Sequence, residues 1–132
     1  MKISKVGAAI LKNGKVLVVK ESDWKKYGIP GGTLKKDETY IDCLRREMKE
    51  ELKSDIKLSS LEFLGNYEDK AMNEHDKIIE IKLYKVELEG NPEKTSEIED
   101  MFWFGISDDL NKLGPIDKNH LIPTLVERGL LQ

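Results

Sequence analysis

The 132-residue sequence predicts an α+β fold in which a mixed β-sheet lies between helices. Three observations lead to this prediction. Two strand-like segments open the chain, an amphipathic helix interrupts the strands, and a second amphipathic helix follows the last strand. The length is typical of one domain with its own hydrophobic core, so we expect residues 1–132 to form a single domain.

The first two strands are expected at residues 3–11 and 15–20. Asn13-Gly14 separates these two apolar runs, and this dipeptide is the strongest short signal for a hairpin turn. Residues 16–19 are continuously apolar, which indicates a strand covered on both faces. Such a strand belongs in the middle of a layered sheet rather than at a solvated edge.

The second half of the stretch 31–51 is expected to form the first helix. Its apolar positions recur at helical spacing and are Tyr40, Ile41, Leu44, Met48 and Leu52. Asp37 or Thr39 can cap the start of this helix. Glu38 adds negative charge there, which the positive end of the helix dipole favours.

Two further strands are expected at residues 61–67 and 78–88. The second one alternates polar residues with apolar ones, the latter including Ile79, Ile81 and Leu83. The connection between them, residues 68–77, is highly charged. It contains His75, to which we assign no role, because no cysteine or second histidine accompanies it.

The end of the chain is expected to contain a short strand at residues 101–104 and a helix at residues 118–128. Pro123 falls near the first turn of this helix, where a missing N–H is tolerated, and Gly129 suits its end. His120 is assigned no role, for the same reason as the other histidine.

Composition excludes several classes of function. The net charge of −3 argues against binding to a nucleic-acid polymer or to an anionic membrane surface. No apolar run reaches the roughly 18 residues that a membrane-spanning helix needs. The single Cys43 cannot form an internal disulfide, which fits a reducing compartment, and we expect a cytoplasmic protein.

The first helix carries three carboxylates beside its apolar stripe. At 100° per residue, Glu47, Glu50 and Glu51 fall on one face, where they repel one another by a few tenths of a kcal/mol per pair. Mg²⁺ or Mn²⁺ offsets this repulsion well, because hard cations prefer oxygen ligands. A solvated acidic face is the alternative. Gly31-Gly32 lies just upstream, where backbone can approach the site and offer carbonyl oxygens.

This stretch resembles the signature of the Nudix hydrolase superfamily, G-x5-E-x7-R-E-U-x-E-E-x-G-U with U apolar. The residues that match it are Gly32, Glu38, Arg46, Glu47, Met48, Glu50 and Glu51. If residues were drawn at random from the composition of this chain, a match at all these positions would occur on the order of once in 10⁵. Two positions differ, because Lys53 replaces the final glycine and Ser54 replaces an apolar residue. A left-handed lysine costs roughly 1–2 kcal/mol, unless the helix ends another way.

The resemblance implies an α/β/α sandwich and a metal-dependent enzyme. Similar enzymes cleave a nucleoside diphosphate linked to a further group, and they do so between phosphates. The metal neutralises the pyrophosphate and lowers the pKa of a bound water toward 7. The resemblance makes Glu51 and Glu47 the first metal ligands, Glu50 a further or water-bridged ligand, and the Gly31 carbonyl a backbone ligand.

The resemblance leaves the general base open. It is either a carboxylate of the motif, matching Glu47, or an acid in the loop before the Trp-Phe strand, for which Glu97 is the best match. Glu50 and Arg46 complete the expected catalytic set. Arg46 is expected to pair with Glu38 or Glu47 and so orient the carboxylates; a salt bridge of purely structural worth is the alternative.

Substrate contacts are expected on both sides of the motif. Gly32 and Glu38 should border the substrate. Tyr27, and Trp24 in the same loop, can stack on a nucleobase or can instead cover the edge of the core. Lys20 can bind phosphate or meet only water.

Three functions therefore compete. The favoured one is a pyrophosphohydrolase that acts on a small nucleotide or nucleotide-sugar, such as an oxidised deoxynucleoside triphosphate, ADP-ribose or a dinucleoside polyphosphate. The second is a catalytically silent nucleotide-binding module of the same fold. The third is an acidic helix of an interaction protein that binds no metal. Homodimer formation stays open, because specificity in similar enzymes lies in loops and in dimer contacts.

Overall fold

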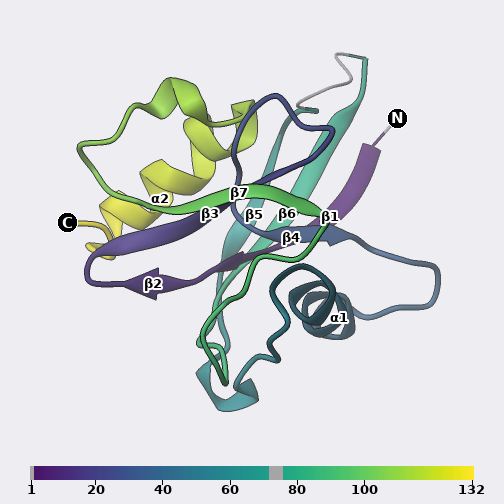
Figure 1. The fold of residues 1–132 in the computed structure, drawn as a ribbon. Coiled ribbons are helices and arrows are strands. Elements are labelled where there is room, and N and C mark those ends of the chain that lie inside the picture. The colour runs from purple at the N-terminus through teal and green to yellow at the C-terminus, as the bar shows by residue number, and fades with distance from the viewer. Residues whose placement is uncertain (1, 72–75) are drawn as a thin grey trace.

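The computed structural model describes residues 2–71 and 76–132, and its two helices lie on opposite sides of the strands (Figure 1). The strands are β1 (Lys2–Ala9), β2 (Leu11–Lys12), β3 (Lys15–Glu21), β4 (Gly31–Thr33), β5 (Glu62–Lys70), β6 (Ile78–Lys85) and β7 (Ile98–Phe104). The helices are α1 (Tyr40–Leu52) and α2 (Ile122–Glu127). A mixed sheet has the order β4-β1-β6-β5, with β1 and β6 parallel, and a smaller antiparallel sheet has the order β2-β3-β7. The predicted α+β class with a mixed sheet is confirmed.

The first predicted strand is split between the two sheets. β1 ends at Ala9, and the chain enters the smaller sheet at Leu11. The carbonyl of the intervening Ile10 accepts a hydrogen bond from the Leu17 N–H at 2.9 Å, which holds the bend. The predicted hairpin at Asn13-Gly14 is confirmed, with φ values of 52° and 75° at the two residues, as a type I′ turn requires.

Strand β3 is covered on both faces, as its apolar sequence predicts. Val16 and Val18 belong to the core beneath α2, and Leu17 and Val19 belong to the core beneath α1. Successive strand residues point to opposite faces, so a continuously apolar run supplies both cores. The chain therefore has two hydrophobic cores, one on each side of the sheets.

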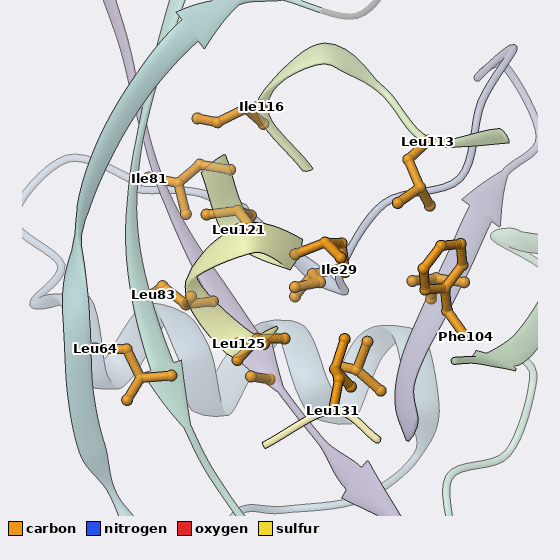
Figure 2. Packing of buried hydrophobic residues seen from close by; sticks show 14 of the residues in the cluster. Ile29, Leu64, Ile81, Leu83, Phe104, Leu113, Ile116, Leu121, Leu125 and Leu131 are labelled. Carbon is orange, nitrogen blue, oxygen red and sulfur yellow. The ribbon is translucent and has the colours of Figure 1, made fainter. Parts of the chain in front are cut away.

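The core beneath α2 joins the two sheets to the C-terminal segment. Figure 2 shows Leu121 and Leu125 of that segment facing Ile81 and Leu83 of β6. Phe104 of β7 belongs to the same cluster and is 1% exposed. The predicted alternation along β6 is confirmed, because its apolar residues on this face are buried.

The core beneath α1 fixes the helix that carries the carboxylates. Leu44, Met48 and Leu52 are fully buried, and Cys43 packs beside them rather than lying at the surface. Thr39 caps the helix by accepting a hydrogen bond from the Asp42 N–H at 3.1 Å. The predicted helix and its apolar stripe are thus both present, and the carboxylates beside the stripe are held in place by this packing.

Several boundaries differ from the predicted ones. β5 continues to Lys70 and β7 already begins at Ile98, because their charged residues take part in strand pairing. The last helix begins with a wide π-helical turn, Asp117–Leu121, before α2. Pro123 lies in the first turn of α2, where its missing N–H leaves the preceding turn free to widen. His75 lies outside the described residues.

No helix in the described part of the chain is long and apolar enough to cross a membrane.

Lys53 adopts the conformation that normally favours glycine. Its φ and ψ are 56° and 33°, and its N–H donates to the Lys49 carbonyl at 3.2 Å. This bond is the one that defines the αL type of helix end, and the next N–H, that of Ser54, donates to the Met48 carbonyl at 3.4 Å. The helix therefore ends with Lys53 in the left-handed conformation, which is one of the two outcomes expected where the motif has glycine and this chain has lysine.

We predict that Lys53→Gly raises the free energy of unfolding by about 0.5–1 kcal/mol. The substitution removes the left-handed penalty of a residue with a Cβ, and the greater freedom of glycine in the unfolded chain offsets part of the gain. Urea denaturation of both proteins measures the change. Lys53→Ala is the matched control, since it removes the same side chain but keeps the Cβ and should bring no gain. Equal stability of the glycine and alanine variants would contradict the prediction.

Candidate active site

The glycine pair on β4 lets helix α1 come into contact with backbone. A Cβ atom at Gly32 would overlap the carboxylate of Glu47, and one at Gly31 would overlap the carbonyl oxygen of Val6 on β1. Gly31 and Gly32 pair with β1 in antiparallel register, which fixes their position. The Glu47 carboxylate therefore lies directly against the β4 backbone, beside the carbonyls that the motif was expected to supply.

Arg46 binds three of the carboxylates in and near α1. Its Nε and Nη2 atoms donate to the two oxygens of Glu38 at 2.7 and 3.0 Å, and its Nη1 atom donates to Glu47 at 2.8 Å and Glu50 at 3.3 Å. Its Nη2 atom also donates to the Thr33 carbonyl at 3.2 Å. The hydrogen bonds from Arg46 lower the pKa of Glu38 to about 2. Arg46 thus pairs with both predicted partners and fixes their orientation.

Glu51 is the most deeply buried of these carboxylates. It is 1% exposed, and neither of its oxygens has a hydrogen-bond partner among the described residues. Burial raises its pKa well above the usual range, and the negative charges of Glu21 and Glu47 raise it further. A buried charge without a partner costs several kcal/mol, so this side chain requires either a proton or a cation.

Glu21 lies at the same site, although the sequence analysis did not select it. It ends β3, and burial raises its pKa to about 7, with further contributions from the charges of Asp23, Glu47 and Glu97 and an opposing one from Lys5. A signal for Glu21 was present in the sequence. It follows residues 17 and 19 at alternate strand positions, and these two face α1.

Two other predicted residues, Glu97 and Lys20, do not line the cavity that contains Glu47 and Glu50. Glu97 is exposed, and its carbonyl accepts from the Ser22 N–H at 3.3 Å, so it lies at the rim next to Glu21. The Lys20 Nζ atom lies 2.8 Å from a carboxylate oxygen of Glu99. The ammonium group of Lys20 on β3 is thus paired with Glu99.

Tyr27 covers the edge of the core beneath α2. Its ring packs edge-to-face on Phe102 at 5.0 Å between centroids, and its hydroxyl donates to Asp100 at 2.6 Å. The hydrogen bond to Asp100 and burial raise the pKa of Tyr27 to about 12. Of the two roles considered for Tyr27, this position fits a ring that covers the edge of the core and not one that stacks on a nucleobase. The other aromatic residue of the loop, Trp24, faces the glycine pair instead.

Two adjoining cavities flank the glycine pair. One of about 440 Å³ is lined by Glu47 and Glu50 of α1 and by Glu21, and the other, of about 260 Å³, extends toward the C-terminal segment and reaches Asp117. Lys5 and Trp24 line both cavities, and the Lys5 Nζ atom lies 5.6 Å from the centre of the Trp24 ring. Sequence reasoning missed Lys5, which the sheet brings from the start of the chain to the centre of the site.

Asp117 is a buried carboxyl group at the far end of the smaller cavity. It is 4% exposed, and its Oδ1 atom accepts from the Ile29 N–H at 2.9 Å. Burial raises its pKa to about 7. A Cβ atom at Gly28 would lie 2.8 Å from its other oxygen, so a glycine gives the carboxyl room. Sequence reasoning missed this residue as well, because nothing nearby in the chain marks it as buried.

The donor set suits a hard divalent cation. Its side chains offer only oxygen, which Mg²⁺ and Mn²⁺ prefer. No group of three or more His, Cys, Asp or Glu side chains within residues 2–71 and 76–132 is already arranged around one ion. Arg46 holds Glu47 and Glu50, whereas the two free oxygens of buried Glu51 fit a cation. Glu51, Glu47 and the Gly31 carbonyl would hold it.

The layered fold and the carboxylate-bearing helix beside a glycine strand define a hydrolase domain of the Nudix type. The family model described as NUDIX domain matches residues 1–125, and the chain belongs to this family. It is accordingly a Nudix-type hydrolase, an enzyme that acts on a phosphoric anhydride bond. No curated protein sequence matches the chain.

Solved structures share the fold at low sequence identity. The E. coli ORF135 protein is 22% identical with a TM-score of 0.74, covering 96% of this chain and 91% of its own. The MutT Nudix hydrolase from Burkholderia pseudomallei is 20% identical with a TM-score of 0.73, covering 96% and 97%. A bifunctional NMN adenylyltransferase/ADP ribose pyrophosphatase from Francisella tularensis, complexed with AMP and a manganese ion, is 18% identical with a TM-score of 0.68. The match covers 97% of this chain and 42% of that protein.

We predict that Asp117→Asn changes the pH dependence of stability. Because the folded-state pKa of Asp117 is raised from 3.8 to about 7, the wild type loses stability as the pH rises between these values, by at most roughly 4 kcal/mol. Asparagine keeps the acceptor for the Ile29 N–H and cannot ionise. The stability of the variant relative to the wild type should therefore grow from pH 5 to pH 8.

Urea denaturation at several pH values measures this difference between the two proteins. Glu127→Gln is the control, because it removes the same charge from an exposed position on α2. A stability difference for Asp117→Asn that stays constant from pH 5 to pH 8 would show that Asp117 is ionised in the folded protein throughout that range.

Proposed function

We propose that this hydrolase is a divalent-metal-dependent pyrophosphohydrolase that acts on a nucleoside diphosphate linked to another group. The observation that carries the proposal is the buried carboxylate of Glu51, whose two oxygens have no partner among the described residues. A side chain kept in this state requires a cation or a proton, and the negative charge of Glu47 beside it favours a divalent cation.

We assign different roles in anhydride cleavage to the residues of the site. Glu51, Glu47 and the Gly31 carbonyl would bind the cation, which neutralises phosphate charge and lowers the pKa of bound water. Arg46 fixes the Glu47 carboxylate against the β4 backbone, so the ligand does not have to be ordered when substrate arrives. Glu47 and Glu97 remain the two candidates for the general base, and Glu50 is a further ligand or water-bridged partner.

The two cavities support a substrate with a phosphate part and a nucleoside part. The larger cavity is lined by Glu21, Glu47 and Glu50 and would take the phosphates. Lys5 offers a positive charge between the two cavities. The smaller one would take the base, with Trp24 as a stacking surface and Asp117 as a hydrogen-bonding group. We therefore favour Trp24 over Tyr27, and Lys5 over Lys20, as contacts of the substrate.

Two of the similar structures described above carry names that fit this class, MutT Nudix hydrolase and ADP ribose pyrophosphatase. They support a small nucleotide or nucleotide-sugar as substrate without selecting one for this chain. The acidic-interaction-helix alternative is disfavoured, since Glu51 is buried rather than solvated. A cytoplasmic location and a homodimer stay predictions.

We predict that Glu51→Gln lowers turnover by about 100-fold or more while the fold is retained. Glutamine keeps the shape but loses the charge that would hold the cation. The assay is release of phosphate or pyrophosphate from a panel of oxidised deoxynucleoside triphosphates, ADP-ribose and dinucleoside polyphosphates, with Mg²⁺ present. Glu62→Gln, exposed on β5, is the control. Turnover within about threefold of wild type would remove Glu51 from the site.

We predict that chelation and dialysis abolish hydrolysis, and that Mg²⁺ or Mn²⁺ restores it. The reason is that the carboxylates alone repel an anionic pyrophosphate, so the reaction needs a cation between them. The same nucleotide panel gives the measurement. Full activity of the dialysed protein, with residual metal excluded by elemental analysis, would count against the whole mechanism.

A further inference from the structure

We infer that Glu21 is a further ligand of the divalent cation, supplied by strand β3 from the side opposite helix α1. This inference rests on the proposed metal-dependent function, and it adds to the motif carboxylates an acid that lies outside the motif. Three features of the described structure carry it: the direction of β3, the distribution of positive charge, and the burial of Glu51.

The direction of β3 places Glu21 on the face that α1 covers. Leu17 and Val19 belong to the core beneath α1, and the next position on that face is Glu21. The register between β3 and β7 shifts at this point. Lys20 pairs with Asp100, whereas Glu21 pairs with Ile98. Such a bulge redirects a strand end beside a site. Glu21 thus follows the apolar residues on the face toward α1, and it lines one cavity together with Glu47 and Glu50 of that helix.

The distribution of positive charge leaves Glu21 and Glu51 without a partner. Arg46 binds Glu38, Glu47 and Glu50, and these hydrogen bonds occupy its guanidinium. Among the described residues, no ion pair within 4.0 Å includes Glu21 or Glu51. Lys5, the cation that acts on Glu21, lies over the Trp24 ring instead.

The burial of Glu51 shows that this arrangement lacks a positive group. The side chain is 1% exposed with two unpartnered oxygens, and the charges that act on it most are those of Glu21 and Glu47. Glu21 and Glu47 also line one cavity, so two of the charges that act on the buried Glu51 border the same space. A divalent cation between these three carboxylates would pair with all of them.

The geometry of cation binding favours ligands from two directions. Mg²⁺ and Mn²⁺ take six oxygen ligands in a near-octahedral arrangement, and carboxylates of one helix face can occupy only one side of it. Glu21 on β3 supplies a ligand from the facing side. Binding of the cation would then link α1 to β3, so the metal should stabilise the fold as well as support the reaction.

The test compares Mn²⁺ binding by five metal-free proteins: the wild type, Glu21→Gln, Glu21→Asp, Glu51→Gln and the surface control Glu62→Gln. Calorimetric titration gives the dissociation constant for Mn²⁺, and electron paramagnetic resonance of free Mn²⁺ checks it. We expect Glu21→Gln to weaken binding by about tenfold or more, and Glu62→Gln to change it by less than about twofold. Neither readout depends on activity.

Thermal unfolding gives a second readout, which a purely structural role would not produce. Without metal, Glu21→Gln should melt at or above the wild-type temperature, because it removes a repelling charge from the site. With Mn²⁺, its gain in melting temperature should be smaller than that of the wild type. A Mn²⁺-dependent gain equal to that of the wild type would overturn the inference.

The variants separate this inference from the proposed function. If Glu51→Gln weakens Mn²⁺ binding and Glu21→Gln does not, Glu21 is no ligand but the proposed metal site stands. If Glu51→Gln binds Mn²⁺ as tightly as the wild type, the metal site itself fails. Glu21→Asp keeps the carboxylate on a shorter side chain and should bind Mn²⁺ more tightly than Glu21→Gln. Equal weakness of these two variants, or a failure of the aspartate variant alone to fold, would count against a ligand at this position.

Discussion

The contact between the Glu47 carboxylate and the bare backbone of Gly32 determines where the rest of the site lies. No residue with a Cβ fits at Gly32, because that atom would overlap the carboxylate. Helix α1 can lie close to β4 only under this condition. In this packing Glu51 is buried and Arg46 reaches the carbonyl of Thr33 on β4. The glycine at this position thus serves packing first, and the chemistry of the site depends on that packing.

The positive charge of Arg46 compensates some carboxylates of the site and leaves another without a partner. The guanidinium holds three carboxylates, Glu38, Glu47 and Glu50, whereas the buried Glu51 has no hydrogen-bond partner among the described residues. The folded chain carries this unfavourable burial because the apolar stripe of α1, including Met48 and Leu52, is fully packed on the sheets. Packing of the apolar side of the helix therefore supports the unstable arrangement of its acidic side.

The parts of the structure that depend on local sequence could be predicted. The hairpin at Asn13-Gly14 follows from turn chemistry, and α1 with its carboxylates follows from helical period and motif spacing. Lys5 and Asp117 could not be found in this way, because the packing of the sheets and the C-terminal segment brings them to the site from distant parts of the chain. Glu21 alone left a signal, since it lies on the same strand face as two apolar core positions.

The loop between β3 and β4 contributes Trp24 to both cavities, whereas the carboxylates of the site belong to α1 and the end of β3. Under the proposed function, recognition and bond cleavage are therefore carried by separate pieces of the chain. A loop can be exchanged, lengthened or shortened without moving a packed helix, since connecting segments tolerate insertion far better than cores do. This scaffold can consequently acquire a new preference among nucleotides during evolution while its hydrolytic machinery is inherited intact.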